Sequence, residues 1–79
     1  MMNTPEYMFK QRLLAASFHN ASDNGGEHAD ARQLTIDAAA IAVQHGFTAE
    51  KVDALFTEAR PLVDPAYLRR LIREARGET

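Results

Sequence analysis

The residues of this sequence that could support catalysis or bind a metal ion are three histidines and two serines. His19, His28 and His45 lack the i, i+4 spacing that lets two histidines on one helix share a metal ion, and each lies near a predicted helix end. Ser17 and Ser22 lie near His19 and His28, but nothing in the spacing requires a nucleophile paired with a base. We therefore predict no catalytic residue, no metal site, no cofactor and no enzymatic activity.

A second group of residues that could bind a ligand is a set of arginines near the end of the chain. They fall on the exposed face of a helix predicted over residues 65–76, and they are Arg69, Arg70, Arg73 and Arg76. Guanidinium groups on neighbouring helical turns can bind carboxylates or phosphates bidentately. Three interpretations remain open: a solvated helix face, a site for an acidic protein or a second copy of the chain, and a site for nucleic acid.

The first helix is predicted from Pro5 to about His19, with Thr4 as its N-cap. Its apolar side chains form two groups on nearly opposite sides. One group contains Tyr7, Met8, Leu14, Ala15 and Phe18, and the other contains Phe9, Leu13 and Ala16. One group can face the core, so the other needs a second contact. We assign the group with Phe9 and Leu13 to a partner protein or to a second copy of the chain.

The middle of the chain predicts a loop followed by a buried helix. Residues 20–28 are rich in Asn, Ser, Asp and Gly, which favour turns, and we interpret Gly25-Gly26 as part of a plain connector rather than an anion site. A second helix is predicted over residues 29–44 and is apolar over most of its circumference, so we expect it at the centre of the bundle. Gly46 has the position of a left-handed helix terminator.

A third helix is predicted over residues 49–60, with Thr48 as its N-cap. A helical wheel of this segment separates a face predicted to be buried from a face predicted to be exposed. The buried face has Val52, Leu55, Phe56 and Ala59, and the exposed face has Glu50, Asp53, Thr57 and Glu58. Pro61 prevents continuation, and we expect Leu62 and Val63 to point inward. Asp64-Pro65 then starts the fourth helix, which is predicted to bury Tyr67, Leu68, Leu71, Ile72 and Ala75.

The stretch from Ile41 to Phe56 resembles the core of a helix-turn-helix. The residues that carry the resemblance are the small Ala42, Gly46 in the turn, and Val52 and Leu55 in the following helix. This resemblance implies a DNA-binding regulator, although the carboxylates of the third helix would repel phosphate. The Gly46-Phe47 turn also resembles the ubiquitin-associated type of three-helix domain, which implies that a Gly-Phe loop and the last helix bind a partner protein.

Length and composition narrow the fold class, the number of domains and the expected location of the protein. The chain has 79 residues, no cysteine and a net charge of -2. These values predict one all-α domain over residues 1–79, a compact bundle of four short helices in which the second and third pair like a helix-turn-helix. Residues 1–9 lack signal-peptide character and no apolar run is long enough to span a membrane, so we expect a cytoplasmic protein.

The function predicted from these observations is a small, non-enzymatic protein-interaction module. It would act as a regulator, adaptor or inhibitor that covers a surface of a larger protein, as small proteins encoded by phages or mobile elements do, and it could form a homodimer. The alternative is a helix-turn-helix DNA-binding regulator. Nucleic acid is the less expected partner because the net charge is negative.

Overall fold

The computed structural model describes residues 4–22 and 29–77, which form helices without any strand. The helices are α1 (Pro5–Ser22), α2 (Ala29–Gln44), α3 (Ala49–Ala59) and α4 (Pro65–Ala75). The predicted all-α bundle of four short helices is therefore confirmed. Helix α1 ends three residues later than expected, at Ser22 rather than at His19. The rest of the predicted loop, including Gly25-Gly26, lies outside the described residues.

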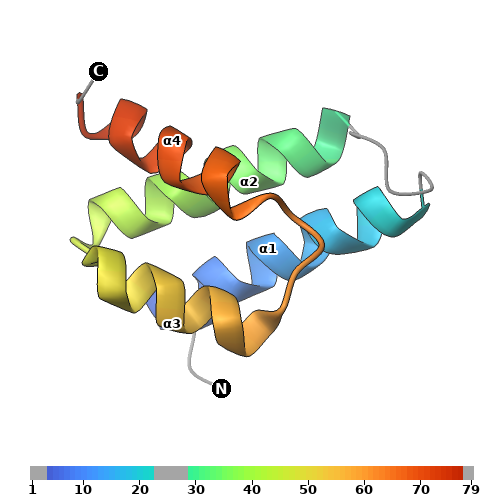
Figure 1. Ribbon diagram of the computed structural model, residues 1–79, viewed down its shortest axis with the longest axis horizontal. Helices are drawn as coiled ribbons and strands as arrows, with labels where there is room; N and C mark the ends of the chain where they lie inside the picture. Colours follow the sequence, from blue (N-terminus) through green and yellow to red (C-terminus); the bar gives the residue numbers. More distant parts are fainter. Residues whose placement is uncertain (1–3, 23–28, 78–79) are drawn as a thin grey trace.

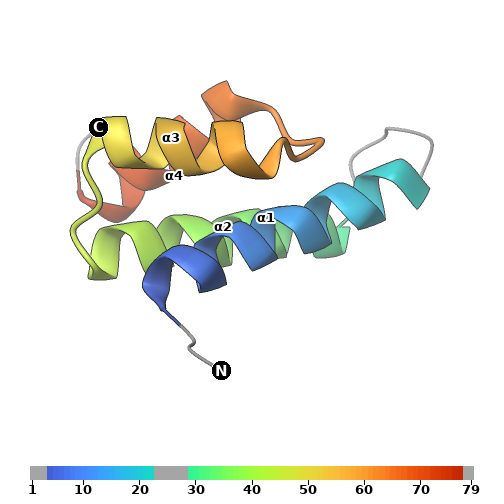
Figure 2. The same cartoon turned by 90° about the horizontal axis from the view of Figure 1, so that it is seen from below.

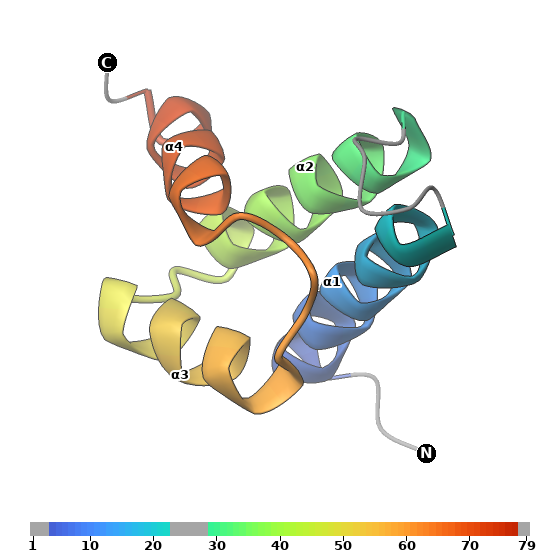
Figure 3. The same cartoon turned by 45° about the vertical axis from the view of Figure 1, so that its right-hand side comes forward.

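The four helices lie in two layers. Helices α1 and α2 run antiparallel side by side, and α3 and α4 cover one face of that pair (Figures 1 and 2). The pairs that pack extensively are α1 with α2, α2 with α4, and α1 with α3. Helix α2 thus has the central position that its apolar circumference predicted, but α1 shares that position. Helix α3 follows α2 after a tight turn, yet it packs mainly on α1 (Figure 3).

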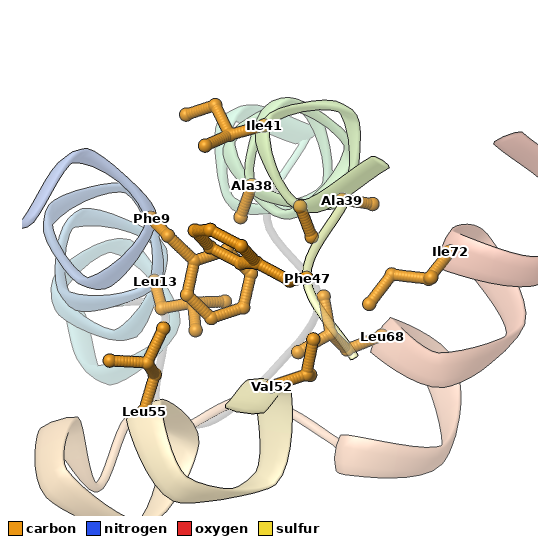
Figure 4. Packing of buried hydrophobic residues seen from close by; sticks show 11 residues of the cluster. Phe9, Leu13, Ala38, Ala39, Ile41, Phe47, Val52, Leu55, Leu68 and Ile72 are labelled. Atoms are coloured by element: carbon orange, nitrogen blue, oxygen red, sulfur yellow. The ribbon is translucent and has the colours of Figure 1, made fainter. Parts of the chain in front are cut away.

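The core lies between the two layers, and every helix contributes to it. Phe9 of α1 contacts the Phe47 ring edge-on, with centroids 5.7 Å apart and planes at 80°. Figure 4 shows this aromatic pair among aliphatic side chains from α2, α3 and α4. The α2 residues at its centre are mostly small, with Ala38 and Ala42 fully buried. Small side chains allow α1 and α4 to approach α2 closely without leaving voids.

The turn from α2 to α3 has the hydrogen bonds of a Schellman motif. Gly46 adopts a φ of 65°, and its N–H donates to the Val43 carbonyl at 3.2 Å. The Phe47 N–H donates to the Ala42 carbonyl at 2.9 Å, which brings the Phe47 side chain back over the end of α2. Thr48 then caps α3 by accepting from the Lys51 N–H at 3.1 Å. The local sequence signals for this turn are confirmed.

The connection between α3 and α4 differs from the expectation. Arg60 ends α3 in the left-handed region, with a φ of 49°, and Pro61 is buried. Leu62, predicted to point inward, is 53% exposed, and Val63 is half-buried. The backbone of Leu62 is held outside the core because its N–H donates to Ser17 Oγ at 2.7 Å and its carbonyl accepts from Asn20 Nδ2 at 2.8 Å. The same Asn20 bond explains why α1 continues beyond His19.

Helix α4 begins as predicted. Asp64 accepts from the Ala66 N–H at 2.9 Å, and Pro65 occupies the first turn. Leu68 and Ile72 are buried, whereas Ala75, expected in the core, is exposed near the end of the helix. None of the described helices is both long and apolar enough to cross a membrane.

Candidate interaction surface

The structure places Phe9 and Leu13, two residues predicted to bind a partner, in the core. Both side chains are fully buried, and both point toward Phe47 between the two layers (Figure 4). The assignment of the two sides of α1 therefore has to be reversed. The side that includes Phe9 and Leu13 packs inside the protein, and the side that includes Leu14 and Phe18 is exposed.

Three of the large apolar side chains that remain exposed lie on α1 or on the connection that is bonded to Ser17 of α1. Leu14 is 47% exposed, Phe18 is 69% exposed and Leu62 is 53% exposed. Leu14 and Phe18 follow one another on the surface of α1 at i, i+4 spacing, and the bond from the Leu62 N–H to Ser17 Oγ attaches the backbone of the third residue to the same helix. We call these three residues the apolar patch. Helical periodicity could identify two of its members, but Leu62 joins it through a contact between distant parts of the chain.

The four arginines of α4 are exposed, as predicted, but they do not form one uniform face. Arg76 donates to the Phe47 carbonyl at 2.6 Å, and Arg69 pairs with Asp53 of α3 at 3.3 Å. These two side chains therefore connect α4 to neighbouring parts of the fold. Arg70 and Arg73 line an open groove instead. The predicted set thus divides into a pair that contacts other parts of the fold and a pair that lines the groove.

The groove lies between the first half of α2, the connection that precedes α4, and α4 from its first turn to its last, with Asn20 of α1 also in its lining. Its volume is about 830 Å³, and its lining combines apolar side chains with Arg32, Arg70 and Arg73. Asp64 is the one carboxylate among the described residues that line it. Leu62, which we include in the apolar patch, also belongs to this lining, and its backbone bonds to Ser17 and Asn20 connect this side of the groove to α1. The place of Arg32 in this groove could not be predicted from the sequence, because α2 and α4 meet only in the folded protein.

Neither resemblance seen in the sequence is accompanied by an obvious contact surface at the turn between α2 and α3. Phe47 is buried in the core, so this Gly-Phe turn does not present its aromatic ring to a partner. The exposed side of α3 carries Glu50, Asp53 and Glu58, as predicted. Glu58 accepts from Lys10 of α1 at 3.1 Å. Such a surface offers carboxylates where a recognition helix needs donors for phosphates and base edges.

The histidines do not come together in the described part of the protein. The His19 ring lies 5.9 Å from that of Phe18, whereas the His45 ring lies 6.4 Å from that of Phe47, near the opposite end of the α1 and α2 pair. His28 lies outside the described residues. Within residues 4–22 and 29–77, no three His, Asp or Glu side chains are grouped so that they could hold a metal ion.

The ion pair between Glu6 and Lys51 leads to a prediction about protonation. Lys51 Nζ lies 2.6 Å from a Glu6 carboxylate oxygen, and this hydrogen bond lowers the pKa of Glu6. Because the charged form is favoured in the folded protein, the pair stabilises the fold at neutral pH, and this contribution is lost as the pH falls through the lowered pKa.

Replacing Lys51 with Met should raise the pKa of Glu6 toward its ordinary value in an NMR titration of the side-chain carboxyl carbon. Lys10→Met removes the other lysine that links α1 to α3 and should leave the pKa of Glu6 unchanged; an equal rise would contradict the assignment.

Comparisons with protein-family models, with curated protein sequences and with solved structures find no match to this chain. What the chain defines by itself is a small four-helix protein with exposed apolar side chains on α1 and an arginine-lined groove that shares Leu62 with the apolar patch.

Proposed function

We propose that the protein is a non-enzymatic, cytoplasmic protein-interaction module that binds a larger protein through the apolar patch. The observation that carries the proposal is the exposure of Leu14 and Phe18 on adjacent turns of α1, together with an exposed Leu62 whose backbone is bonded to the same helix. Adjacent exposed apolar residues are typical of binding surfaces, whereas isolated ones are ordinary.

The energetic argument rests mainly on Phe18. An aromatic ring that is 69% exposed loses little of its contact with water when the chain folds, so it retains most of its capacity to stabilise an interface. Aromatic anchors dominate the binding energy of many interfaces, with surrounding residues excluding water from them. Leu14 and Leu62 are placed to provide that surrounding apolar contact.

The charge distribution favours a protein partner over duplex DNA. The helix-turn-helix-like reading would place α3 in the major groove, and its exposed Glu50, Asp53 and Glu58 would meet phosphates there. The net charge of -2 adds a long-range repulsion. DNA binding through this segment is therefore the alternative, and tight, strongly salt-dependent binding of a random duplex would support it.

A comparison of matched surface variants tests the proposed function. The tagged protein and its Leu14→Gln, Phe18→Gln variant would be used to capture partners from nuclease-treated lysate of the source cells, followed by quantitative mass spectrometry. Both positions are exposed and glutamine is a good helix former, so we expect each substitution to change stability by no more than about 0.5 kcal/mol. A protein captured by the parent should be depleted at least about tenfold with the variant.

The control variant is Ile36→Gln. Ile36 is 41% exposed but lies on α2, outside the apolar patch, so its replacement matches the removal of one exposed apolar side chain at a different position. Partner capture should survive this change. If the patch variant captures the same proteins as the parent in the same amounts, or if no protein is captured specifically, the proposed function is wrong.

A further inference from the structure

We infer that the groove beside the apolar patch binds an acidic segment of the partner protein, one that carries carboxylate side chains together with a small apolar side chain. This inference rests on the proposed function and specifies the chemistry of the partner. Four observations support it: the charge of the groove, the arrangement of its arginines, its apolar lining and its connection to α1 through Leu62.

The charge of the groove is opposite to that of the whole chain. Among the described residues, its lining holds three arginines, Arg32, Arg70 and Arg73, and one carboxylate, that of Asp64. Asp64 is itself engaged as the N-cap of α4, where one of its oxygens accepts from the Ala66 N–H. The protein as a whole has a net charge of -2. Positive potential is thus concentrated locally, and it would attract an acidic segment.

The two arginines of α4 that line the groove are available for an anion. The Arg70 guanidinium lies over the Tyr67 ring, 5.4 Å from its centroid, which restricts its position. Its ion pair with Glu74 spans 3.7 Å between two exposed side chains, and such pairs contribute little to stability. Arg73 has no ion-pair partner among the described residues. A carboxylate can therefore bind either guanidinium without displacing a strong internal contact.

The apolar part of the lining favours a peptide over a nucleic acid backbone. Ala31, Pro61, Val63 and Ala66 contribute to the lining between the charged groups. These side chains can cover a small apolar side chain but offer nothing to a ribose or a phosphate. Leu62 lines the groove and its N–H is bonded to Ser17 of α1, so a segment bound in the groove reaches the helix that carries Leu14 and Phe18. One partner can thus place an apolar anchor on the patch and carboxylates in the groove.

Short fluorescein-labelled peptides rich in glutamate and carrying one valine are suitable probes, measured by fluorescence anisotropy over a salt series and mapped by NMR on the whole protein. Chemical-shift changes should concentrate at Arg70, Arg73 and Ala31. The variant Arg70→Gln, Arg73→Gln should weaken binding by about tenfold, since two charge-assisted contacts are lost. A peptide with lysine in place of glutamate should not bind.

The matched control removes the same charge outside the groove. Arg60→Gln, Arg69→Gln eliminates two exposed arginines that do not line it, so it changes the net charge equally. This variant should keep the affinity of the parent to within about twofold, because long-range attraction alone is strongly screened by salt. Equal weakening by both variants would show non-specific charge attraction and overturn the inference.

Two further outcomes would also overturn it. One is a failure of the glutamate-rich peptides to bind the parent. The other is a random DNA duplex that binds more tightly than the peptides and depends on Arg70 and Arg73. Neither decides whether the proposed function is correct, because the capture experiment depends on Leu14 and Phe18. A partner lost with the patch variant but unaffected by Arg70→Gln, Arg73→Gln would uphold the module and reject the acidic segment.

Discussion

Replacing both Phe9 and Leu13 with glutamate is expected to unfold the protein. Both side chains are fully buried against Phe47 and the core residues of the other helices. Each substitution would place an unpaired carboxylate in an apolar site, which costs several kcal/mol. A domain of 79 residues has a total stability of about 4 to 12 kcal/mol. The far-UV circular dichroism of the variant should therefore lack most of the helical signal, with no cooperative melting transition.

The same helix provides a control with identical residue types. Leu14→Glu, Phe18→Glu replaces one leucine and one phenylalanine of α1 by glutamate at exposed positions, so the variant should remain helical and melt cooperatively. A folded Phe9→Glu, Leu13→Glu variant together with an unfolded Leu14→Glu, Phe18→Glu variant would show that α1 is rotated by about half a turn from its position in this structure.

The ends of the helices could be predicted because their signals are local. Thr48, Gly46 and Asp64 act on backbone groups within a few residues, and each forms the bond that its position predicted. The end of α1 was missed for the opposite reason. Asn20 looks like a loop residue in the sequence, but it donates to the Leu62 carbonyl, a contact with a residue far along the chain.

The side of α1 that faces the core could not be predicted from its periodicity. The helical wheel of α1 has apolar groups on two opposite sides, and either side could face the core. The decision depends on Phe47, which the Schellman turn brings back over α2 and against Phe9. The core also needs small side chains where helices cross closely, and Ala16 lies on the Phe9 side of α1, where it is fully buried.

The candidate site could be predicted only in part for a related reason. The exposure of the arginines follows from the helical wheel of α4, but their separate roles depend on other elements. Arg69 meets Asp53 of α3, and Arg76 meets the Phe47 carbonyl. Arg70 and Arg73 remain at the groove, which exists only because α2 and the connection before α4 form its other walls.

Truncating Leu68 to alanine is expected to destabilise the protein by about 2 to 5 kcal/mol, the usual range for a buried leucine. Leu68 is one of two side chains that α4 buries, the other being Ile72, and it contributes to the core beside Val52 (Figure 4). Its removal leaves α4 attached mainly by Ile72 and by exposed polar contacts such as Arg69 with Asp53. Urea denaturation should show the loss of stability, and hydrogen exchange should show faster opening of the α4 amides than in the parent.

Leu62→Ala is the matched control for this prediction. It removes the same atoms from a leucine only six positions away in the sequence, but Leu62 is 53% exposed, so the change in stability should stay within about 0.5 kcal/mol. Its backbone bonds to Ser17 and Asn20 do not involve the side chain and should persist. Similar losses for the two variants would mean that Leu62 belongs to the core. The apolar patch would then lose one of its three members, whereas a clear difference places Leu62 at the surface, where a partner can reach it.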